Sequence, residues 1–276
     1  MSDYTVTTRD EAPDVLGDYP GELRMYTGPL GCEQVAFSWR VMPQGTGGKG
    51  SYGHSHKTQE EIYFVISGRL EFKLGDELVE LGPNTVVRLA PSTVRSVWNE
   101  RPEEAELVMC SIRVEGADHE THEDFWPEDT PSASALPEEP LSSGEYTILN
   151  LGHVPDPSGD APGEIRFCTG SLDTEQMAFT YRRIPPGTGG IAGKRIGHSH
   201  KTQEEVYFVI AGTLRFKLDG EEFDVGPKTA VRIGPGTTRA VWNAGEEDVE
   251  MLMCSVKVED LRAEVEMDPD FWPGPD

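Results

Sequence analysis

Short apolar segments recur along the chain, and residues that favour turns bound each of them. Stretches such as EEIYFVISG, LEFKLG and TVVRLAP are rich in β-branched and aromatic residues and are separated by Gly, Pro and Asn. No stretch keeps the 3.6-residue period of an amphipathic helix for more than a turn or two. Many short strands at regular spacing predict an all-β sandwich or barrel.

The chain is an internal duplication. The stretch GELRMYTG that opens at Gly21 returns as GEIRFCTG at Gly163, 142 residues later. A two-residue insertion then moves the offset to 144, and Gly53–Asn99 matches Gly197–Asn243 at about 30 of 47 positions. Each copy closes on the tripeptide Phe-Trp-Pro. Two complete copies predict two modules of the same fold.

The segment between the two copies has a different composition. It reads WPEDTPSASALPEEPLSSGE, which is rich in Pro, Ser and Glu and lacks apolar periodicity, as is typical of a linker with a solvated backbone. We therefore predict a first module over residues 1–127, a linker over 128–144 and a second module over 145–276. The total of 276 residues suits two domains of ordinary size.

The most specific motif is GHSHKTQEEIYFVISG from Gly53, which returns as GHSHKTQEEVYFVIAG from Gly197. Side chains two residues apart on a strand share a face, so His54 and His56 should point the same way. A turn through residues 57–59 should bring a second strand alongside, beginning near Glu61. Two imidazoles and a carboxylate can hold one divalent ion, so the predicted metal ligands are His54, His56, Glu61, His198, His200 and Glu205.

This motif resembles the first motif of the cupin family, G-x5-H-x-H-x3,4-E-x6-G, with Glu61 and Glu205 as the motif glutamates. The second cupin motif, G-x5-P-x-G-x2-H-x3-N, is matched loosely from Gly82 to Asn99 and from Gly226 to Asn243. The resemblance covers nearly the whole chain and identifies it as similar to a two-domain cupin, or bicupin. It implies an all-β fold of two tandem double-stranded β-helix (jelly-roll) barrels, with the metal ligands pointing into each barrel.

Each module departs from the family at one ligand. The histidine of the second cupin motif falls at Arg95 in the first copy and at Arg239 in the second. Arginine cannot ligate a metal, because it is always protonated. Each module would then offer two histidines and one glutamate, which resembles the facial triad of non-haem iron sites. The implied cofactor is a divalent ion, with iron, manganese, nickel and zinc as candidates.

The arginines have other interpretations. Arg95 could pair with Glu61 and replace the metal by an internal ion pair, since a guanidinium beside a divalent cation costs repulsion. It could instead grip a carboxylate or phosphate group of an anionic substrate. Strand alternation from Glu61 places a tyrosine on the same face, where it either lines the pocket or packs in the core. The predicted substrate-binding residues are Arg95, Arg239, Tyr63 and Tyr207.

Composition narrows the class of partner. The chain has 49 acidic against 24 basic residues, a net charge of −25, which disfavours nucleic acid and anionic membranes as partners. Such a surface fits either adaptation to high salt or an ordinary solvated acidic surface. No secretory signal and no apolar run of membrane-spanning length is visible, so we expect a cytoplasmic protein. The four cysteines lie outside any C-x-x-C pair, and we expect them to be reduced and structural.

These observations support more than one function. The first hypothesis is a metal-dependent enzyme acting on a small polar or anionic molecule, an oxygenase, with isomerase and decarboxylase activities as alternatives. The second is a binding or sensing bicupin without turnover, in which the arginine has displaced the metal. In a third, one module is catalytic and the other is a stabilising copy. We expect the modules to face each other as an intramolecular pseudo-dimer, with further oligomerisation left open.

Overall fold

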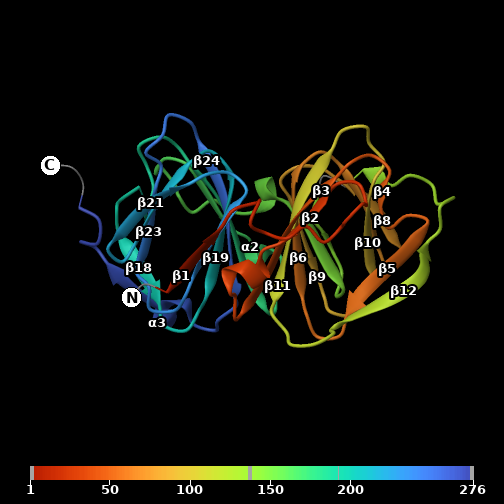
Figure 1. Cartoon of the computed structure of the whole chain (residues 1–276), viewed down its shortest axis with the longest axis horizontal. Helices are drawn as coiled ribbons and strands as arrows, with labels where there is room; N and C mark the ends of the chain where they lie inside the picture. Colours follow the sequence, from red (N-terminus) through yellow and green to blue (C-terminus); the bar gives the residue numbers. More distant parts are fainter. Residues whose placement is uncertain (1–2, 136–138, 192, 274–276) are drawn as a thin grey trace.

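Two lobes of similar size lie side by side in the computed structural model, which describes residues 3–135, 139–191 and 193–273 (Figure 1). Each lobe is a sandwich of two sheets, whose strands are antiparallel apart from one short parallel pairing. The prediction of an all-β chain with two tandem jelly-roll barrels is confirmed. Within these residues, helix is confined to single turns at α1 (Thr27–Leu30), α2 (Cys168–Ser171), α3 (Leu261–Glu264) and the 3-10 turn Leu151–His153.

The first barrel has an inner sheet that faces the other lobe and an outer sheet that faces away from it. The inner sheet contains, in spatial order, β14 (Leu141–Ser142), β15 (Tyr146–Asn150), β9 (Thr85–Leu89), β6 (Glu61–Ser67), β11 (Ala105–Ile112), β3 (Val35–Met42) and β2 (Glu22–Met25). The outer sheet contains β12 (His119–Trp126), β5 (Ser51–His56), β10 (Arg95–Asn99), β7 (Leu70–Leu74), β8 (Glu77–Leu81) and β13 (Ser134–Ala135), with β4 (Thr46–Gly47) paired to β10.

The second barrel repeats this arrangement. Its inner sheet contains β1 (Tyr4–Thr7), β22 (Thr229–Ile233), β19 (Glu205–Ala211), β24 (Val249–Val256), β17 (Met177–Ile184) and β16 (Glu164–Phe167). Its outer sheet contains β21 (Glu221–Val225), β20 (Leu214–Leu218), β23 (Arg239–Trp242), β18 (Gly197–His200) and β25 (Val265–Asp268).

The two barrels exchange one strand each. β1 comes from the first copy of the repeat but pairs with β22 of the second barrel, with Tyr4 opposite Ile233. β15 comes from the second copy but pairs with β9 of the first barrel, with Tyr146 opposite Leu89. Figure 1 shows β1, in red, lying within the blue and cyan lobe. The repeat pattern does not predict this exchange. Each barrel therefore contains one strand that lies outside the residue range predicted for its module.

The segment predicted as a linker contributes to the first barrel. Ser134–Ala135 pairs in parallel with Val79–Glu80 of β8, and Leu141–Ser142 pairs with β15. Residues 136–138 lie outside the described residues. The turn-rich composition of this segment therefore does not prevent short stretches of its backbone from joining sheet edges, where few side-chain contacts are needed.

The inner sheets pack back to back and share one hydrophobic core. Strand alternation decides which side chains enter it: on β6, Ile62 and Phe64 face the other lobe, while Tyr63 and Val65 face the barrel interior. Aromatic contacts cross the interface in reciprocal pairs, with ring centroids 5.2 Å apart for Phe37 and Phe208 and 5.9 Å apart for Phe64 and Phe179. These pairs are related by the repeat, as in the self-complementary interface of a two-fold dimer.

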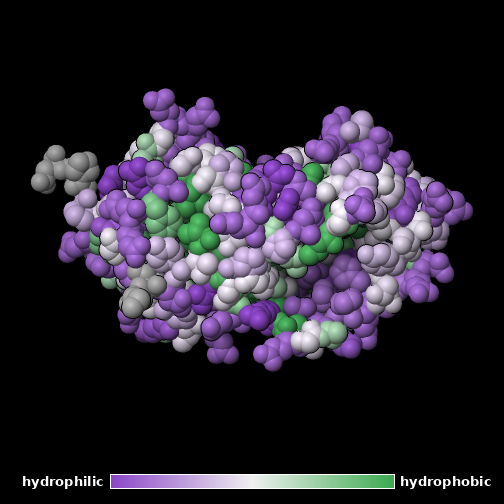
Figure 2. Space-filling model, viewed as in Figure 1, coloured by the Kyte–Doolittle hydropathy of each residue, from purple (hydrophilic) through white to green (hydrophobic). Residues whose placement is uncertain are grey.

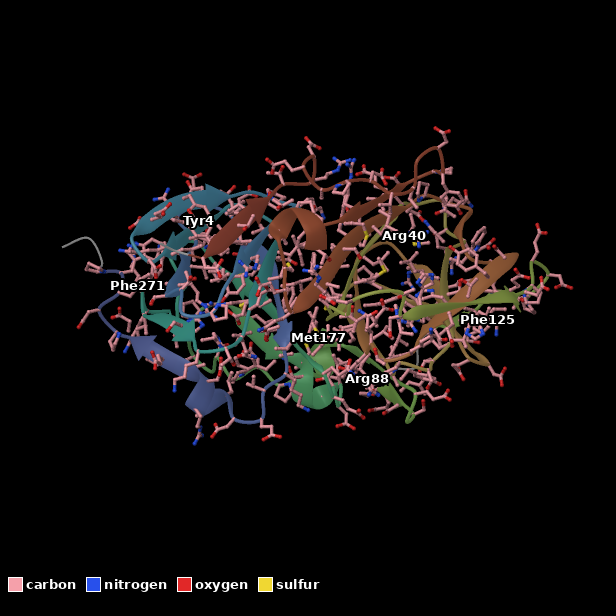
Figure 3. All side chains as sticks on the ribbon, turned by 60° about the horizontal axis from the view of Figure 1, so that its bottom comes forward. Tyr4, Arg40, Arg88, Phe125, Met177 and Phe271 are labelled. Atoms are coloured by element: carbon pink, nitrogen blue, oxygen red, sulfur yellow. The ribbon has the colours of Figure 1, made fainter. Side chains whose placement is uncertain are left out.

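A buried carboxylate from each barrel binds the backbone of the other. Glu60 accepts hydrogen bonds from the backbone N–H groups of residues 175–177, and from Nε of Arg88 at 2.8 Å. Glu204 accepts the equivalent bonds from residues 33–35 and from Nε of Arg232 at 2.7 Å. Figure 3 shows Arg88 and Met177 near the middle of the molecule. Because both partners are buried, these pairs hold the lobes in one orientation.

The Phe-Trp-Pro endings pack at the outer ends of the molecule, where Figure 3 labels Phe125 and Phe271. The ring of Phe125 lies against Gly53, and that of Phe271 lies against Gly197, so closely that a Cβ atom at either glycine would overlap the ring. Each glycine directly precedes the first histidine of its motif, so the aromatic residue covers the start of the histidine strand.

The four cysteines are buried and free, as predicted. Cys110 and Cys254 belong to the core shared by the two barrels. Hydrophilic residues cover most of the face seen in Figure 2, with small hydrophobic patches in both lobes. Among the described residues, no helix is long and apolar enough to cross a membrane.

We expect Glu60→Gln to lower the free energy of unfolding by about 3–5 kcal/mol, because it removes the buried counter-charge of Arg88 and leaves only the exposed Glu175, whose Oε1 lies 3.5 Å from Nη2. Glu204→Gln should cost less, since Arg232 keeps its contact with Asp3 at 2.6 Å. Urea unfolding monitored by tryptophan fluorescence would measure both. The matched control is Asp224→Asn, which breaks the exposed pair with Arg215 and should cost less than about 1 kcal/mol. Equal losses in all three variants would contradict this role for the buried pair.

Candidate metal centres

The predicted metal ligands converge within each barrel. His54 and His56 lie on β5, His198 and His200 lie on β18, and Glu61 and Glu205 open β6 and β19. In each group one ligand atom from every residue lies within 4.8 Å of the others. The structure therefore brings together all six residues that the sequence singled out as ligands.

The route by which they converge differs from the prediction in one respect. The expectation that the strand beginning at Glu61 lies alongside the histidine strand is wrong. β5 pairs with β10 and β12 in the outer sheet, whereas β6 pairs with β9 and β11 in the inner sheet. The turn crosses from one sheet to the other, so Glu61 faces the histidines across the barrel interior.

The glutamate divides its two carboxylate oxygens between different neighbours. Oε1 of Glu61 lies 3.3 Å from Nε2 of His56, and Oε1 of Glu205 lies 3.6 Å from Nε2 of His200. Oε2 of Glu61 accepts a hydrogen bond from the hydroxyl of Tyr63 at 3.0 Å and from Nε of Arg95 at 3.1 Å. Nε2 of His54 also lies nearest Oε2, at 3.9 Å. Oε1 is thus directed at His56, while Oε2 is held by Tyr63 and Arg95.

Arg95 and Arg239 are buried, and each forms an ion pair with the glutamate of its site. Arg95 stands opposite His54 in the strand register, and Arg239 stands opposite His198. Both Nε and Nη2 of Arg239 donate to Oε2 of Glu205, at 3.1 and 2.6 Å, and Nη1 donates to the carbonyl of Thr237 at 3.0 Å. Arg95 makes the same three contacts, with Glu61 and Thr93. The internal ion pair considered from the sequence is present in both barrels, and it neutralises the charge that an anionic substrate would otherwise meet.

Tyr63 and Tyr207 pack in the barrel cores and also contact the candidate sites. Tyr63 and Tyr207 are buried in the barrel cores, and each hydroxyl donates to the site glutamate at 3.0 Å. They therefore hold the carboxylate in place from within the core. Their predicted contact with a substrate stays a prediction.

Burial and charge favour the protonation states that a metal requires. Burial, followed by the charge of Arg95, lowers the pKa of His54 to about 4, and burial with Arg239 does the same for His198. Burial opposes ionisation of Glu205, but Arg239 and the imidazoles outweigh it and lower the pKa of the carboxyl to about 2. The same balance holds the pKa of Glu61 well below its usual range. Neutral imidazoles and ionised carboxylates are the forms that bind metals.

The donor atoms of each group suit a divalent ion. Nε2 is the imidazole nitrogen nearest the glutamate in His54, His56 and His200, so nitrogen and carboxylate oxygen face one small space in the barrel. Nδ1 of His56 points the other way and lies 3.4 Å from Oδ2 of Asp118. Nitrogen and carboxylate oxygen are suitable donors for iron, manganese, nickel and zinc alike.

Sequence reasoning missed the acids that brace the turn beside each group. Asp118 accepts hydrogen bonds from the backbone N–H groups of Thr58 and Gln59. Glu264 does the same for residues 202 and 203 in the second barrel. The sequence does contain a sign that the two acids are equivalent, because each stands seven residues before the Phe of its Phe-Trp-Pro ending. The segments around the two acids are otherwise dissimilar, so the repeat does not single them out.

The second group opens into a cavity of about 690 Å³. His198, His200, Glu205 and Arg239 form part of its wall. Much of the remaining wall is apolar and includes Ile165, Phe167, Ile191, Ile196, Val241 and Met253. A cavity of this size can enclose most of a small organic molecule.

Comparison with known proteins supports the same fold. The sequence resembles an uncharacterised protein of Methanocaldococcus jannaschii, with 32% identity over 65 residues, 24% of this chain and 52% of the relative. The chain thus matches about half the length of that relative. Among solved structures, the oxalate decarboxylase of Lactobacillus farciminis in a formate complex aligns with a TM-score of 0.69 at 12% identity, covering 91% of this chain and 85% of that one. Oxalate decarboxylase from Bacillus subtilis at pH 4.6 gives 0.66 at 14%, covering 90% and 75%.

Similarity at this level of identity establishes the fold alone. The family assignment comes from the sequence, because the cupin domain family matches twice, at residues 38–111 and 181–255. Each match contains one complete group of two histidines and a glutamate. With more than half of its residues covered by two such domains, the chain belongs to the cupin family and is a two-domain cupin.

Proposed function

We propose that this bicupin is a metal-dependent enzyme that acts on a small anionic molecule, with one metal centre in each barrel. The observation that carries the proposal is the convergence of two imidazoles and a carboxylate at equivalent places in both barrels. His54, His56 and Glu61 would hold the first ion, and the second would be held by His198, His200 and Glu205. The Nε2 atoms of His56 and His200, which face the glutamate of their own barrel, support it further.

The surrounding residues would prepare this centre without binding the ion themselves. When bound, the ion would supply a Lewis acid or a centre for oxygen activation. Arg95 and Tyr63 hold Oε2 of Glu61, which fixes the rotation of the carboxylate and leaves Oε1 free to face His56. Contacts of this kind, to the far side of a ligand, orient it and adjust its charge. In the second barrel the apolar cavity wall would exclude water from the reacting groups.

An oxygenase is the reaction class that the ligand count favours. Three protein ligands leave coordination positions for both oxygen and a substrate, as in other sites with two histidines and one carboxylate. A decarboxylase is the alternative suggested by the names of the structural neighbours, and an isomerase also fits a Lewis-acid centre. Nitric oxide bound to the iron-loaded protein and detected by electron paramagnetic resonance would demonstrate open coordination positions.

A second candidate function follows from the arginine contacts. Both guanidinium groups lie on the carboxylates that would bind the ions, Arg95 on Glu61 and Arg239 on Glu205. An ion pair that takes the place of the metal would give a bicupin that binds a small molecule without turnover. Metal content separates this function from the first.

Protein purified without a histidine tag should retain about two equivalents of a transition metal, because each barrel offers one ligand group. His56→Ala should reduce this to about one, since it removes a ligand from the first barrel only. Inductively coupled plasma mass spectrometry would measure both. The control is His119→Ala, an exposed histidine on the neighbouring strand that should leave two equivalents. Unchanged metal content in His56→Ala would contradict the ligand assignment.

Arg95→His distinguishes a metal centre from an internal ion pair. If the barrel binds an ion, the new imidazole adds a fourth ligand, and the metal should resist removal by a chelator more strongly than in the wild type. Competition with a chromogenic chelator would measure this. Lower stability with no gain in metal retention would instead identify Arg95 as the structural partner of Glu61.

The metal-free protein should lose stability as the pH falls from 7.0 to 5.5. His54 and His198 have folded pKa values of about 4 against an ordinary value of 6.5. In this range the unfolded chain therefore binds more protons than the folded chain, which lowers the free energy of unfolding. Denaturant unfolding at several pH values would measure the slope. A variant carrying His54→Gln and His198→Gln should give a shallower slope, and identical slopes would be evidence against the low pKa values.

A further inference from the structure

One arginine in each barrel carries a charge that the protein does not compensate. Arg88, Arg95, Arg232 and Arg239 are buried, and each contacts a glutamate. Arg40 and Arg182 are half-buried at equivalent positions on β3 and β17, and neither has a carboxylate within 4.0 Å in the described residues. A guanidinium partly removed from water without a counter-charge is costly, so its retention needs an explanation.

The contacts of these two arginines are few. The Nε atom of Arg40 is buried and has no hydrogen-bond partner among the described residues. Arg182 donates from Nη2 to the carbonyl of Gly190 at 2.6 Å, a bond that leaves its charge unpaired. Burial lowers the pKa of both side chains, as expected for cations removed from water. The chain has a net charge of −25, so the lack of an acid beside these arginines is not due to a shortage of acids.

Arg182 faces the second cavity. On β17, Phe179 and Tyr181 enter the core between the barrels, whereas Thr180 and Arg182 alternate to the opposite side and line the cavity. The same cavity is lined by His198 and by Tyr207, whose hydroxyl binds the site glutamate. Arg182 therefore projects into the space beside the candidate metal ligands. Figure 3 labels its counterpart Arg40 in the first lobe.

The chemistry of the cavity defines the ligand that would fit it. A guanidinium binds a carboxylate through two parallel hydrogen bonds, and this pairing would supply the missing counter-charge. Arg239 is less suited, because its charge is already paired with Glu205 at 2.6 Å. The apolar residues on the rest of the wall, among them Phe167, Ile191 and Met253, would contact a hydrocarbon body.

We propose that Arg182 binds the carboxylate of a ligand whose apolar body fills the second cavity, so that this barrel takes an amphipathic monocarboxylate. This inference rests on the proposed function, because it takes the cavity to be the substrate site of the second barrel. It extends that function by naming the recognition residue and by requiring an apolar body beside the single acidic group.

The test uses hexanoate and its neutral analogue hexanamide as probes, with the full-length metal-free protein. Binding is followed through the 13C-labelled methyl group of Met253, which lines the cavity, and Met109 serves as its counterpart in the first barrel. Hexanoate should shift the Met253 signal and bind more tightly than hexanamide. Arg182→Met should weaken hexanoate binding by about tenfold or more and leave hexanamide within about twofold.

One further variant and one further measurement make the outcome decisive. Arg40→Met, the matched change in the other barrel, should leave the response of Met253 to hexanoate unchanged. Arg182→Met should be at least as stable as the wild type in thermal unfolding, since it removes an uncompensated charge. Equal affinity for the two probes, no effect of Arg182→Met on hexanoate, or a marked loss of stability in that variant would each overturn the proposal. Because the samples contain no metal, these results stand apart from the metal content that tests the proposed function.

Discussion

The position of two adjacent glutamates at the start of an inner strand governs much of this molecule. Side chains alternate across a strand, so Glu60 must face the other lobe if Glu61 faces the barrel. Glu60 binds the backbone of the second lobe and Arg88, while Glu61 meets the histidines and Arg95. Glu204 and Glu205 repeat the arrangement. The interface and the ligand group therefore share one short piece of backbone, and neither can shift without the other.

Each candidate site places an arginine close to a group of potential metal ligands. A cationic arginine next to a metal centre is unfavourable if both compete for the same oxygen. In each barrel the carboxylate separates them, because Arg95 and Tyr63 bind one oxygen and the imidazole of His56 lies near the other. An arginine in this position would support a metal ligand, as hydrogen-bond partners do around metal sites in general. The ion pair would therefore not prevent the same carboxylate from binding an ion through its other oxygen.

Much of the fold and the ligand group follows from patterns that the sequence displays directly. The duplication, the strands and the six ligands rest on residue spacing, which strand geometry converts into shared faces. Residue spacing does not predict contacts between residues that are distant in sequence. The role of Arg88 depends on its contact with Glu60, which in turn binds residues 175–177. The unpaired charge of Arg182 follows from the absence of a neighbouring acid among the described residues, which only the folded structure shows. The sheet change between His56 and Glu61 was missed because a turn of this length suits a hairpin equally well.

The exchange of β1 and β15 constrains how this gene can change. Each lobe borrows an edge strand from the other half of the chain, so a deletion of either half would leave the survivor with an open sheet edge and an exposed inner face. Neither half can therefore be discarded without loss to the other. Such mutual dependence keeps both candidate ligand groups in one chain while the residues around them are free to diverge, as the dissimilar segments around Asp118 and Glu264 already have.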